Sequence, residues 1–427
     1  MNVHDSEKIA GVLDALGYRR APSAGEADLI LLNTCAVREK AAHKVFARLG
    51  ALRGLKRGAG RVPRIGVAGC LASLEGEEIL RRAPHVDLIV GPRAIMRLPG
   101  LIEASRAGRR AVDIAHHIDS TPDPSNRIAR AAPPHAYVAI VEGCNKACTF
   151  CVVPAARGRE VSRDLDGVVS EIRHLASSGY AEIEFLGQTV NAYRDPRGRT
   201  LADLLSAADG IDGIQRLRFK TSHPLHMSDA LMKAMAELRS VVRHLHLPVQ
   251  SGSDAVLARM RRGYTREGYA GKIRRLREFV PDISVSTDVI VGFPGETERD
   301  FQHTLDLIEE IGFDAVYSFV YSPRPGTPSA EWDDGVTSGE KAQRLSRVQR
   351  LQERIQVAHN AAWIGREVDV LAEGPAKFGR GLMTGRTVHG QIVNFPAEGR
   401  RAGDIVPVRV EEAGPYSLKG RPGGAVS

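Results

Sequence analysis

Cysteine is scarce in this chain, and its scarcity excludes one way of holding a protein together. Only 5 of the 427 residues are cysteine, an odd number, and three of the five stand close together. A disulfide framework normally shows an even number of cysteines spread along a short secreted chain. The pattern instead favours the binding of a metal ion or a metal cluster, with five candidate ligands: Cys35, Cys70, Cys144, Cys148 and Cys151.

Long apolar runs are absent as well. No run of about eighteen apolar residues occurs, so the sequence predicts no membrane span. The N-terminal residues Met1–Asp5 lack the basic and apolar regions of a signal peptide. We therefore expect a cytoplasmic protein without a membrane partner. A length of 427 residues predicts two or three domains.

Acidic residues are fewer than basic ones, 51 against 59, which leaves a formal net charge of +8. This excess favours a polyanionic partner such as nucleic acid, although solvated surfaces rich in arginine have the same composition. The excess is concentrated between Arg38 and Arg64, where Glu39 is the single acid. A nucleic-acid contact and an exposed helix face are equal alternatives for this run.

Residues 1–125 alternate between helix and strand patterns. Apolar side chains at helical spacing predict a helix from Asp5 to Tyr18, with Asp5 or Ser6 as its N-cap. Cys35 and Cys70 each fall just beyond the end of an apolar run, at the edge where open α/β sheets bind ligands. Three such runs predict the strands of a small parallel sheet: Asp28–Asn33, Arg64–Gly69 and Val86–Gly91.

Residues 126–360 repeat strand and helix six times, after a polar connection at residues 118–134 that predicts a domain boundary. The repeat predicts a parallel barrel, complete or partial, with its active site at the C-terminal strand ends. The cysteine triplet follows the first strand. The expected strands are Ala136–Val141, Ile183–Leu186, Arg216–Thr221, His244–Val249, Ile283–Val291 and Ala315–Tyr321. The expected helices include Leu165–Ser177, Leu201–Ala208, Asp229–Glu237, Arg266–Phe279 and Glu298–Ile311.

A long polar helix is predicted from Ser338 to about Ala362. Residues 361–427 then alternate in period two, as in Glu367–Leu371 and Asp404–Val410. This alternation predicts a small all-β domain. A small basic β-barrel is a common nucleic-acid module, and five basic residues are candidates for phosphate contacts: Lys377, Arg380, Arg386, Arg400 and Arg401.

Cys144, Cys148 and Cys151 supply three thiolates within eight residues of one predicted loop. A structural zinc site normally takes four ligands from two separated pairs, and this triplet has no fourth Cys or His nearby in the sequence. A [4Fe–4S] cluster held by three thiolates keeps one iron open. That iron can chelate the amino and carboxylate groups of S-adenosylmethionine (SAM), and an electron from the cluster then cleaves SAM to a 5′-deoxyadenosyl radical.

The residues around the triplet resemble the methylthiotransferase branch of the radical SAM enzymes. This family joins an N-terminal α/β domain, a radical SAM barrel and a C-terminal RNA-binding β-barrel called TRAM, so the resemblance covers essentially the whole chain. It implies a flavodoxin-like domain at 1–125, a partial (β/α)6 barrel at 126–360 and TRAM at 361–427. The segments that carry it are Val141–Pro154, Arg157–Glu160, Ser162–Arg163, Leu186–Asn191, Thr221–Pro224, Leu247–Ser253 and Tyr321–Pro328.

Within the family, Asn33–Ala41 is similar to the tRNA branch. The resemblance implies transfer of a methylthio group to C2 of N6-dimethylallyladenosine at position 37 of tRNAs that read codons beginning with U. Two SAM molecules would be used per product, one for the radical and one for the methyl group. The implied partners are tRNA and a reductant protein such as a flavodoxin or a ferredoxin. The sulfur source is left open, and we expect a monomer.

Two alternatives stand beside this interpretation. The first keeps the chemistry and changes the substrate, to an aspartate of a ribosomal protein or to a threonylcarbamoyladenosine of tRNA. The second is a non-catalytic RNA-binding protein whose iron–sulfur cluster is structural or acts as a sensor. Such a protein would bind RNA without producing 5′-deoxyadenosine from SAM.

The resemblance also implies a second [4Fe–4S] cluster on three cysteines of the N-terminal domain, and one of the three is missing here. Cys35 and Cys70 match two of them, whereas Met1–Glu7 begins one or two residues after the place of the third. The strand that would begin the sheet is missing as well, although the first strand of a flavodoxin-like sheet is internal. We therefore expect that Met1 is an internal methionine.

Four polar residues at or just after strand ends are candidates for binding SAM: Gln188, Asn191, Gln250 and Asp288. Structural hydrogen bonds are an equal alternative for each of them. Gly292–Thr297 is predicted to be a strand-to-helix turn, with Glu296 or Thr297 starting the helix. Phosphate contacts and a solvated loop are equal alternatives for Arg157, Arg159 and Arg163.

The expected upstream start gives a first prediction. The protein isolated from its natural host should be about ten or more residues longer than these 427 residues, because a strand and a cysteine would precede Met1. Its mass should be larger by the mass of those residues. Intact-mass spectrometry measures this difference. A mass that matches the 427 residues contradicts the expectation.

Overall fold

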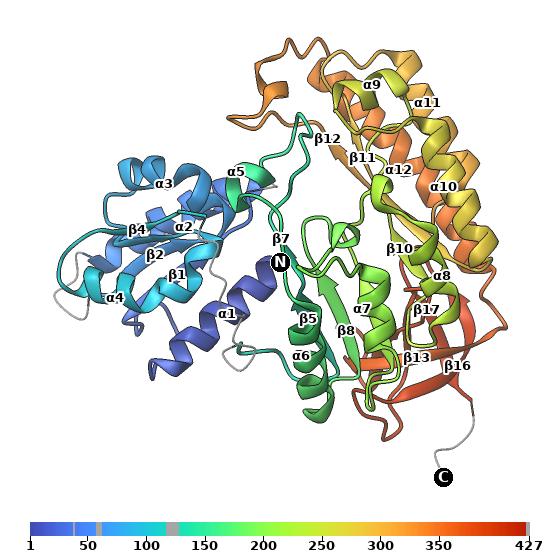
Figure 1. The fold of residues 1–427 in the computed structure, drawn as a ribbon, viewed down its shortest axis with the longest axis horizontal. Coiled ribbons are helices and arrows are strands. Elements are labelled where there is room, and N and C mark those ends of the chain that lie inside the picture. Colours follow the sequence, from blue (N-terminus) through green and yellow to red (C-terminus); the bar gives the residue numbers. More distant parts are fainter. Residues whose placement is uncertain (37–38, 57–61, 117–127, 424–427) are drawn as a thin grey trace. The chain divides into compact units, whose positions relative to one another are not determined.

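The computed structural model describes residues 1–36, 39–56, 62–116 and 128–423, which form two compact units (Figure 1). Most of the connection predicted at residues 118–134 lies outside the described residues. The first unit comprises Met1–Ala131, Val141–Ala147 and Cys151–Arg163, and the second comprises Ala132–Ile140, Cys148–Phe150 and Asp164–Ser427. No helix in the described ranges is long and apolar enough to cross a bilayer.

The first unit is built on a parallel sheet with the strand order β1-β2-β3-β4. Apolar residues of α2 and α3 pack on one face of this sheet, and those of α1 and α4 pack on the other. The predicted small parallel α/β sheet is therefore confirmed. Its elements are α1 (Asn2–Ala15), β1 (Leu29–Asn33), α2 (Glu39–Leu52), β2 (Arg64–Ala68), α3 (Cys70–Arg82), β3 (Leu88–Val90), α4 (Leu98–Arg106) and β4 (Ala111–Asp113).

Two features of this unit differ from the sequence-based expectation. The first helix begins at Asn2, three residues before the predicted N-cap Asp5, which is buried inside the unit. The strand β4 was not predicted, because only three residues of it pair with β3. The unit also contains the short antiparallel strands β6 (Val141–Glu142) and β7 (Val161–Ser162) and the helix α5 (Val153–Arg157).

The second unit contains the six predicted parallel strands in chain order. They form the sheets β5-β8-β9 and β10-β11-β12, and a parallel bridge between Leu217 and Val241 joins β9 to the segment before β10. This arrangement is the expected partial barrel. The strands are β5 (His135–Ala139), β8 (Glu182–Leu186), β9 (Arg216–Phe219), β10 (His244–His246), β11 (Ser284–Val291) and β12 (Ala315–Val320).

The helices between these strands begin where the sequence places capping residues. Asp164 accepts a hydrogen bond from the Gly167 backbone, and Thr297 forms a capping box with Asp300. Such side chains satisfy backbone N–H groups that have no partner in the first helical turn. The helices are α6 (Leu165–Ser177), α7 (Leu201–Ala208), α8 (Asp229–Glu237), α9 (Asp254–Arg259), α10 (Arg266–Phe279) and α11 (Glu298–Ile311).

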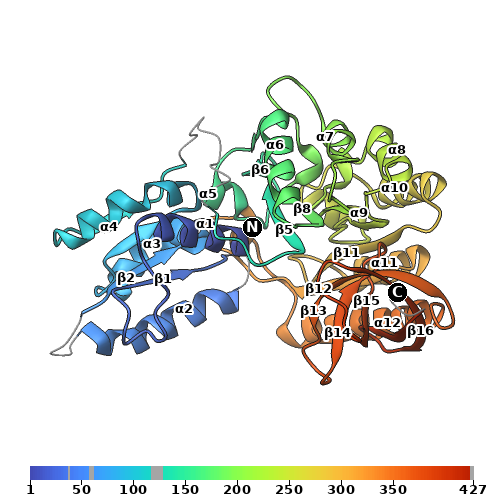
Figure 2. The ribbon, with the colours of Figure 1, turned by 90° about the horizontal axis from the view of Figure 1, so that it is seen from below.

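The predicted all-β domain is a closed five-stranded barrel that follows the long helix α12 (Ser338–Ala361). Figure 2 shows its strands beside α12. The side chain of Asn360, near the end of α12, donates to the carbonyl oxygens of Gly414 and Pro415 at 2.8 and 3.1 Å. The ring order is β13 (Glu367–Pro375), β14 (Leu382–Arg386), β15 (Ile392–Pro396), β17 (Leu418–Pro422) and β16 (Ile405–Ala413).

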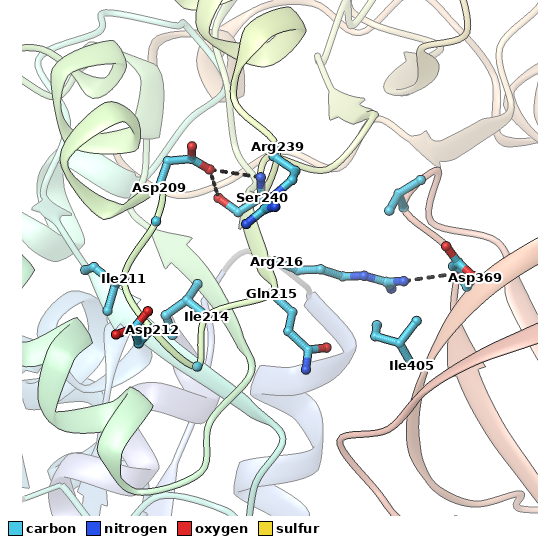
Figure 3. Close-up of a pocket in the computed structure, with 13 residues that line it drawn as sticks. Asp209, Ile211, Asp212, Ile214, Gln215, Arg216, Arg239, Ser240, Asp369 and Ile405 are labelled. Carbon is cyan, nitrogen blue, oxygen red and sulfur yellow. Dashed lines mark hydrogen bonds between the residues drawn. The ribbon is translucent and has the colours of Figure 1, made fainter. Parts of the chain in front are cut away.

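A buried arginine ties the β domain to the larger barrel within the second unit. Arg216, the first residue of β9, donates to the carbonyl oxygen of Asp369 at 3.0 Å and also to that of Arg386. Figure 3 shows Arg216 reaching Asp369 across a cavity of about 390 Å³. Burial lowers the pKa of Arg216 to about 10, so the side chain still carries its charge at neutral pH. The cavity lies at the amino end of β9, the end opposite to that used by barrel active sites.

We expect Arg216→Met to loosen the β domain, because two carbonyl oxygens would lose a charged donor. The loss should lower the free energy of unfolding by about 2–4 kcal/mol, measured by denaturant unfolding followed by tryptophan fluorescence. Arg239→Met is the matched control, since Arg239 lines the same cavity but is exposed. Equal stability of the two variants would contradict the docking role of Arg216.

Candidate functional site

The cysteine triplet lies on the segment that follows β5 and β6. Gly143 precedes it with a φ of +82°, and a Cβ there would meet the Arg159 carbonyl oxygen at 2.2 Å. Only glycine fits this close backbone approach. The Cys144 backbone N–H donates to the Gly158 carbonyl oxygen at 3.2 Å. The start of the cysteine segment is thus held by the chain that returns after α5.

Backbone and side-chain donors point at two sulfur atoms of the triplet. Cys144 is 8% exposed, and its Sγ accepts a hydrogen bond from the Lys146 backbone at 3.4 Å. Cys148 is equally buried, and its Sγ accepts one from Nη1 of Arg262 at 3.3 Å. Cys151 is half-buried. Hydrogen bonds of this kind can orient the sulfur atoms as cluster ligands.

The donor set therefore suits the expected [4Fe–4S] cluster in kind, with three thiols on one short segment. In the described ranges no three His, Cys, Asp or Glu side chains are gathered so that they could hold a metal ion. The assignment of the triplet as cluster ligands accordingly rests on the spacing of the cysteines and on the donors at their sulfur atoms, and it stays a prediction.

Cys35 and Cys70 lie at the carboxyl ends of β1 and β2, as predicted. Cys70 begins α3, and its Sγ accepts a hydrogen bond from Nε of Arg157 at 3.2 Å. Burial raises the pKa of the Cys70 thiol, although the nearby Arg157 acts in the opposite direction. Arg157 is only 4% exposed, and it also forms an ion pair with the buried Asp5. Neither a phosphate contact nor a solvated loop describes Arg157, so both sequence-based alternatives for it were wrong.

The residues present do not complete a second cluster of the expected kind. Cys35 and Cys70 supply two thiols, and each of the other cysteines belongs to the triplet. On α1, both ring nitrogens of the fully buried His4 are without a hydrogen-bond partner, as is Oδ1 of Asp5. The second cluster at this pair stays a prediction, and no chemical step is assigned to it.

The four candidate SAM-binding residues lie in the second unit. Asn191 is buried and uses its amide on the backbone of His223, with distances of 2.9 and 2.8 Å, which matches the structural alternative. Gln250 has a φ of +75°, and its backbone N–H donates to the carbonyl oxygen of Asp288 at 2.9 Å. Gln188 and Asp288 are half-buried. The structure thus brings Gln250 and Asp288 together, while Asn191 pairs elsewhere.

The predicted turn before α11 has the expected helix start at Thr297. Glu296 is buried beneath it, where one carboxylate oxygen accepts from the Gly292 backbone at 2.6 Å and from Nη1 of Arg344 at 2.9 Å. Burial raises the pKa of Glu296 to about 7 despite these donors. These contacts support the structural interpretation of this turn.

The inner face of the sheet β5-β8-β9 is charged, which the sequence analysis did not identify. Glu182 accepts from Nε of Arg218 at 3.2 Å, and Glu184 lies 3.0 Å from Nζ of Lys220. Burial alone would raise the pKa of Glu184, but a hydrogen bond with His135 and the charge of Lys220 lower it to about 2. The signal was available, because charged residues recur in period two along β8 and β9.

The inner face of the other sheet carries histidines. His244 and His246 both contact the hydroxyl of Ser286, at 3.2 and 3.0 Å, and His246 lies 3.5 Å from Asp288. Burial lowers the pKa of His244 to about 3, so this ring is neutral at physiological pH. The barrel interior is therefore polar on both sheets, with Asp288 in the middle of β11.

Two of the five candidate phosphate-binding residues of the β domain are paired with acidic side chains. Arg386 pairs with Glu373 at 2.7 Å and Arg400 pairs with Glu398 at 3.0 Å, so their charges are partly neutralised. Lys377 lies over the ring of Phe378, which is 80% exposed. In the run from Arg38 to Arg64, Lys56 and Arg64 share Asp87, whereas Arg38 and residues 57–61 lie outside the described residues.

Three family descriptions match successive parts of the chain. "Uncharacterized protein family UPF0004" matches residues 1–91, "Radical SAM superfamily" matches residues 138–308, and "TRAM domain" matches residues 362–422. The order agrees with the two α/β regions and the closed β-barrel described above.

Curated relatives are similar over nearly the whole chain. A tRNA-2-methylthio-N(6)-dimethylallyladenosine synthase of Stenotrophomonas maltophilia (strain K279a) is 49% identical, and the match covers 99% of this chain and 90% of the relative. The protein of the same name from Stutzerimonas stutzeri (strain A1501) is 47% identical, with 98% and 96% covered.

Among solved structures, a radical S-adenosylmethionine methyltransferase from Kitasatospora setae, with cobalamin and a [4Fe-4S] cluster bound, is similar in fold. The TM-score is 0.54 at 16% sequence identity, and the match covers 76% of this chain and 73% of that one. This likeness supports the fold alone.

Proposed function

This chain belongs to the tRNA-2-methylthio-N(6)-dimethylallyladenosine synthase family, and we propose that it transfers a methylthio group to C2 of N6-dimethylallyladenosine in tRNA. The base would be the one at position 37 of tRNAs that read codons beginning with U. The observation that carries this proposal is the Cys144–Cys148–Cys151 spacing, at the end of the first barrel strand, in a chain similar to these enzymes over nearly its full length.

The triplet would hold a [4Fe–4S] cluster, which supplies the electron that splits SAM into methionine and a 5′-deoxyadenosyl radical. The chain's own residues have two tasks around it. The backbone of Lys146 and the side chain of Arg262 donate to sulfur atoms, which holds the thiolates in place. Gln188 and Gln250, which follow β8 and β10, and Asp288, which lies within β11, would bind SAM, while Asn191 would shape the loop that follows β8.

The β domain supports tRNA as the substrate. It matches the TRAM description, and its closed barrel carries Lys377 and Arg380 on the loop between β13 and β14. Phosphate contacts from such residues give affinity with little sequence choice. We assign this role to residues 361–427, the radical chemistry to 126–360 and the second cysteine pair to 1–125. A flavodoxin or ferredoxin would supply electrons to a monomer.

We expect the wild-type protein, after anaerobic cluster reconstitution, to form 5′-deoxyadenosine from SAM and dithionite. With tRNA that bears N6-dimethylallyladenosine it should also form the 2-methylthio nucleoside, measured by mass spectrometry of digested tRNA. Cys144→Ala should lose both products, because the cluster loses a ligand and about four irons per chain. Cys70→Ala is the matched control, in which cleavage of SAM should persist.

Two other outcomes contradict the proposal in different ways. Formation of 5′-deoxyadenosine with methylthiolation only of a ribosomal protein or of threonylcarbamoyladenosine would move the substrate and keep the chemistry. Binding of tRNA without any 5′-deoxyadenosine would favour a non-catalytic iron–sulfur protein that binds RNA.

A further inference from the structure

A buried arginine contacts the sulfur of Cys148 from a distant part of the second unit. Arg262 stands 114 residues after Cys148 and is only 6% exposed. Its three nitrogen atoms have three different acceptors: Nη1 donates to Cys148 Sγ at 3.3 Å, Nη2 to the Pro248 carbonyl oxygen at 3.1 Å, and Nε to the Tyr264 hydroxyl at 2.9 Å. The planar guanidinium is therefore fixed in orientation.

Tyr264 fixes the guanidinium in turn. Its hydroxyl donates to the carbonyl oxygen of Val249 at 2.8 Å while it accepts from Arg262, and its ring packs against His223 with centroids 5.8 Å apart. An arginine guanidinium is always protonated in proteins, so Arg262 places a permanent positive charge beside the Cys148 sulfur.

The backbone on both sides of this contact is also held. The Thr149 backbone donates to the Met260 carbonyl oxygen at 3.2 Å, and the Thr149 hydroxyl donates to the Arg259 carbonyl oxygen at 2.9 Å. Three hydrogen bonds therefore join residues 148–149 to residues 259–262. A contact held in this way keeps its geometry when the charge on the sulfur changes.

The contact between Arg262 and Cys148 affects the ease of reduction of a bound cluster in one direction only. Addition of an electron makes the cluster and its thiolates more negative, and both an N–H···S hydrogen bond and a nearby positive charge stabilise the more negative state. Low dielectric surroundings strengthen both effects. Removal of the donor should therefore make the cluster harder to reduce.

We propose that Arg262, oriented by Tyr264, is a positioning residue that raises the midpoint potential of the cluster bound through Cys148. The proposal rests on the proposed function, since it requires a cluster at the triplet. Its step is a one-electron reduction: an external donor such as dithionite or a flavodoxin loses one electron, the cluster gains it, and every N–H proton stays on Arg262.

The test is an anaerobic redox titration of the reconstituted full chain, with the reduced cluster measured by electron paramagnetic resonance. We expect Arg262→Gln to shift the midpoint potential to a more negative value while the iron content stays at that of the wild type. Arg262→Lys, which keeps the charge but not the fork, should shift it less, and Tyr264→Phe should shift it in the same direction. Arg261→Gln removes the same charge at the neighbouring, exposed residue and should leave the potential unchanged.

A wild-type potential in Arg262→Gln at full iron content would overturn the proposal. If that variant does not retain its cluster, Arg262→Lys and Tyr264→Phe decide, and wild-type potentials in both overturn it equally. A merely structural role would change iron content or thermal stability without moving the potential. Absence of any cluster from the wild-type protein would instead overturn the proposed function, and this inference with it.

Discussion

A charge can be buried inside a barrel only when it has a partner, and the central barrel of this chain is built under that constraint. Glu182 and Glu184 on β8 face Arg218 on β9 and Lys220, the exposed residue that follows β9, while the opposite face of the same strands is apolar and fully buried, as Ile183 and Leu217 show. A slip of one residue between these strands would place the charges under the helices and the apolar side chains inside the barrel. The ion pairs therefore favour the observed register of β8 against β9.

Both cysteine groups contain a sulfur atom that contacts a buried arginine, but the net charge around that arginine differs between the two groups. In each, a buried arginine donates to a cysteine sulfur: Arg157 to Cys70, and Arg262 to Cys148. Arg157 is neutralised by the buried carboxylate of Asp5, whereas Arg262 is held by carbonyl and hydroxyl oxygens, which leave its charge in place. Cys70 thus accepts a hydrogen bond from an arginine whose charge is largely neutralised, whereas Cys148 accepts one from an arginine that keeps its charge.

Local patterns in the sequence were enough to predict much of the fold. The helices α6, α7, α8, α10 and α11 begin and end at the predicted residues, because capping side chains such as Asp164 and Thr297 precede regular apolar stripes. The three-residue strand β4 was missed because it is too short to show a pattern. The candidate cysteines were identified from their spacing, but their arginine partners were not, because each contact joins residues 87 or 114 positions apart and leaves no local trace.

The β-barrel closes through an unusual strand. β17 lies between β15, to which it is parallel, and β16, to which it is antiparallel, so the ring is open until Leu418–Pro422 has been added. During synthesis, β13, β14 and β15 can form successive hairpins as they emerge, and β16 can then join β13. Until β17 has left the ribosome, β15 and β16 each present an unpaired edge to other nascent chains. Because β17 is the last strand in the sequence, the barrel can close and cover both edges only after Leu418–Pro422 has been synthesised.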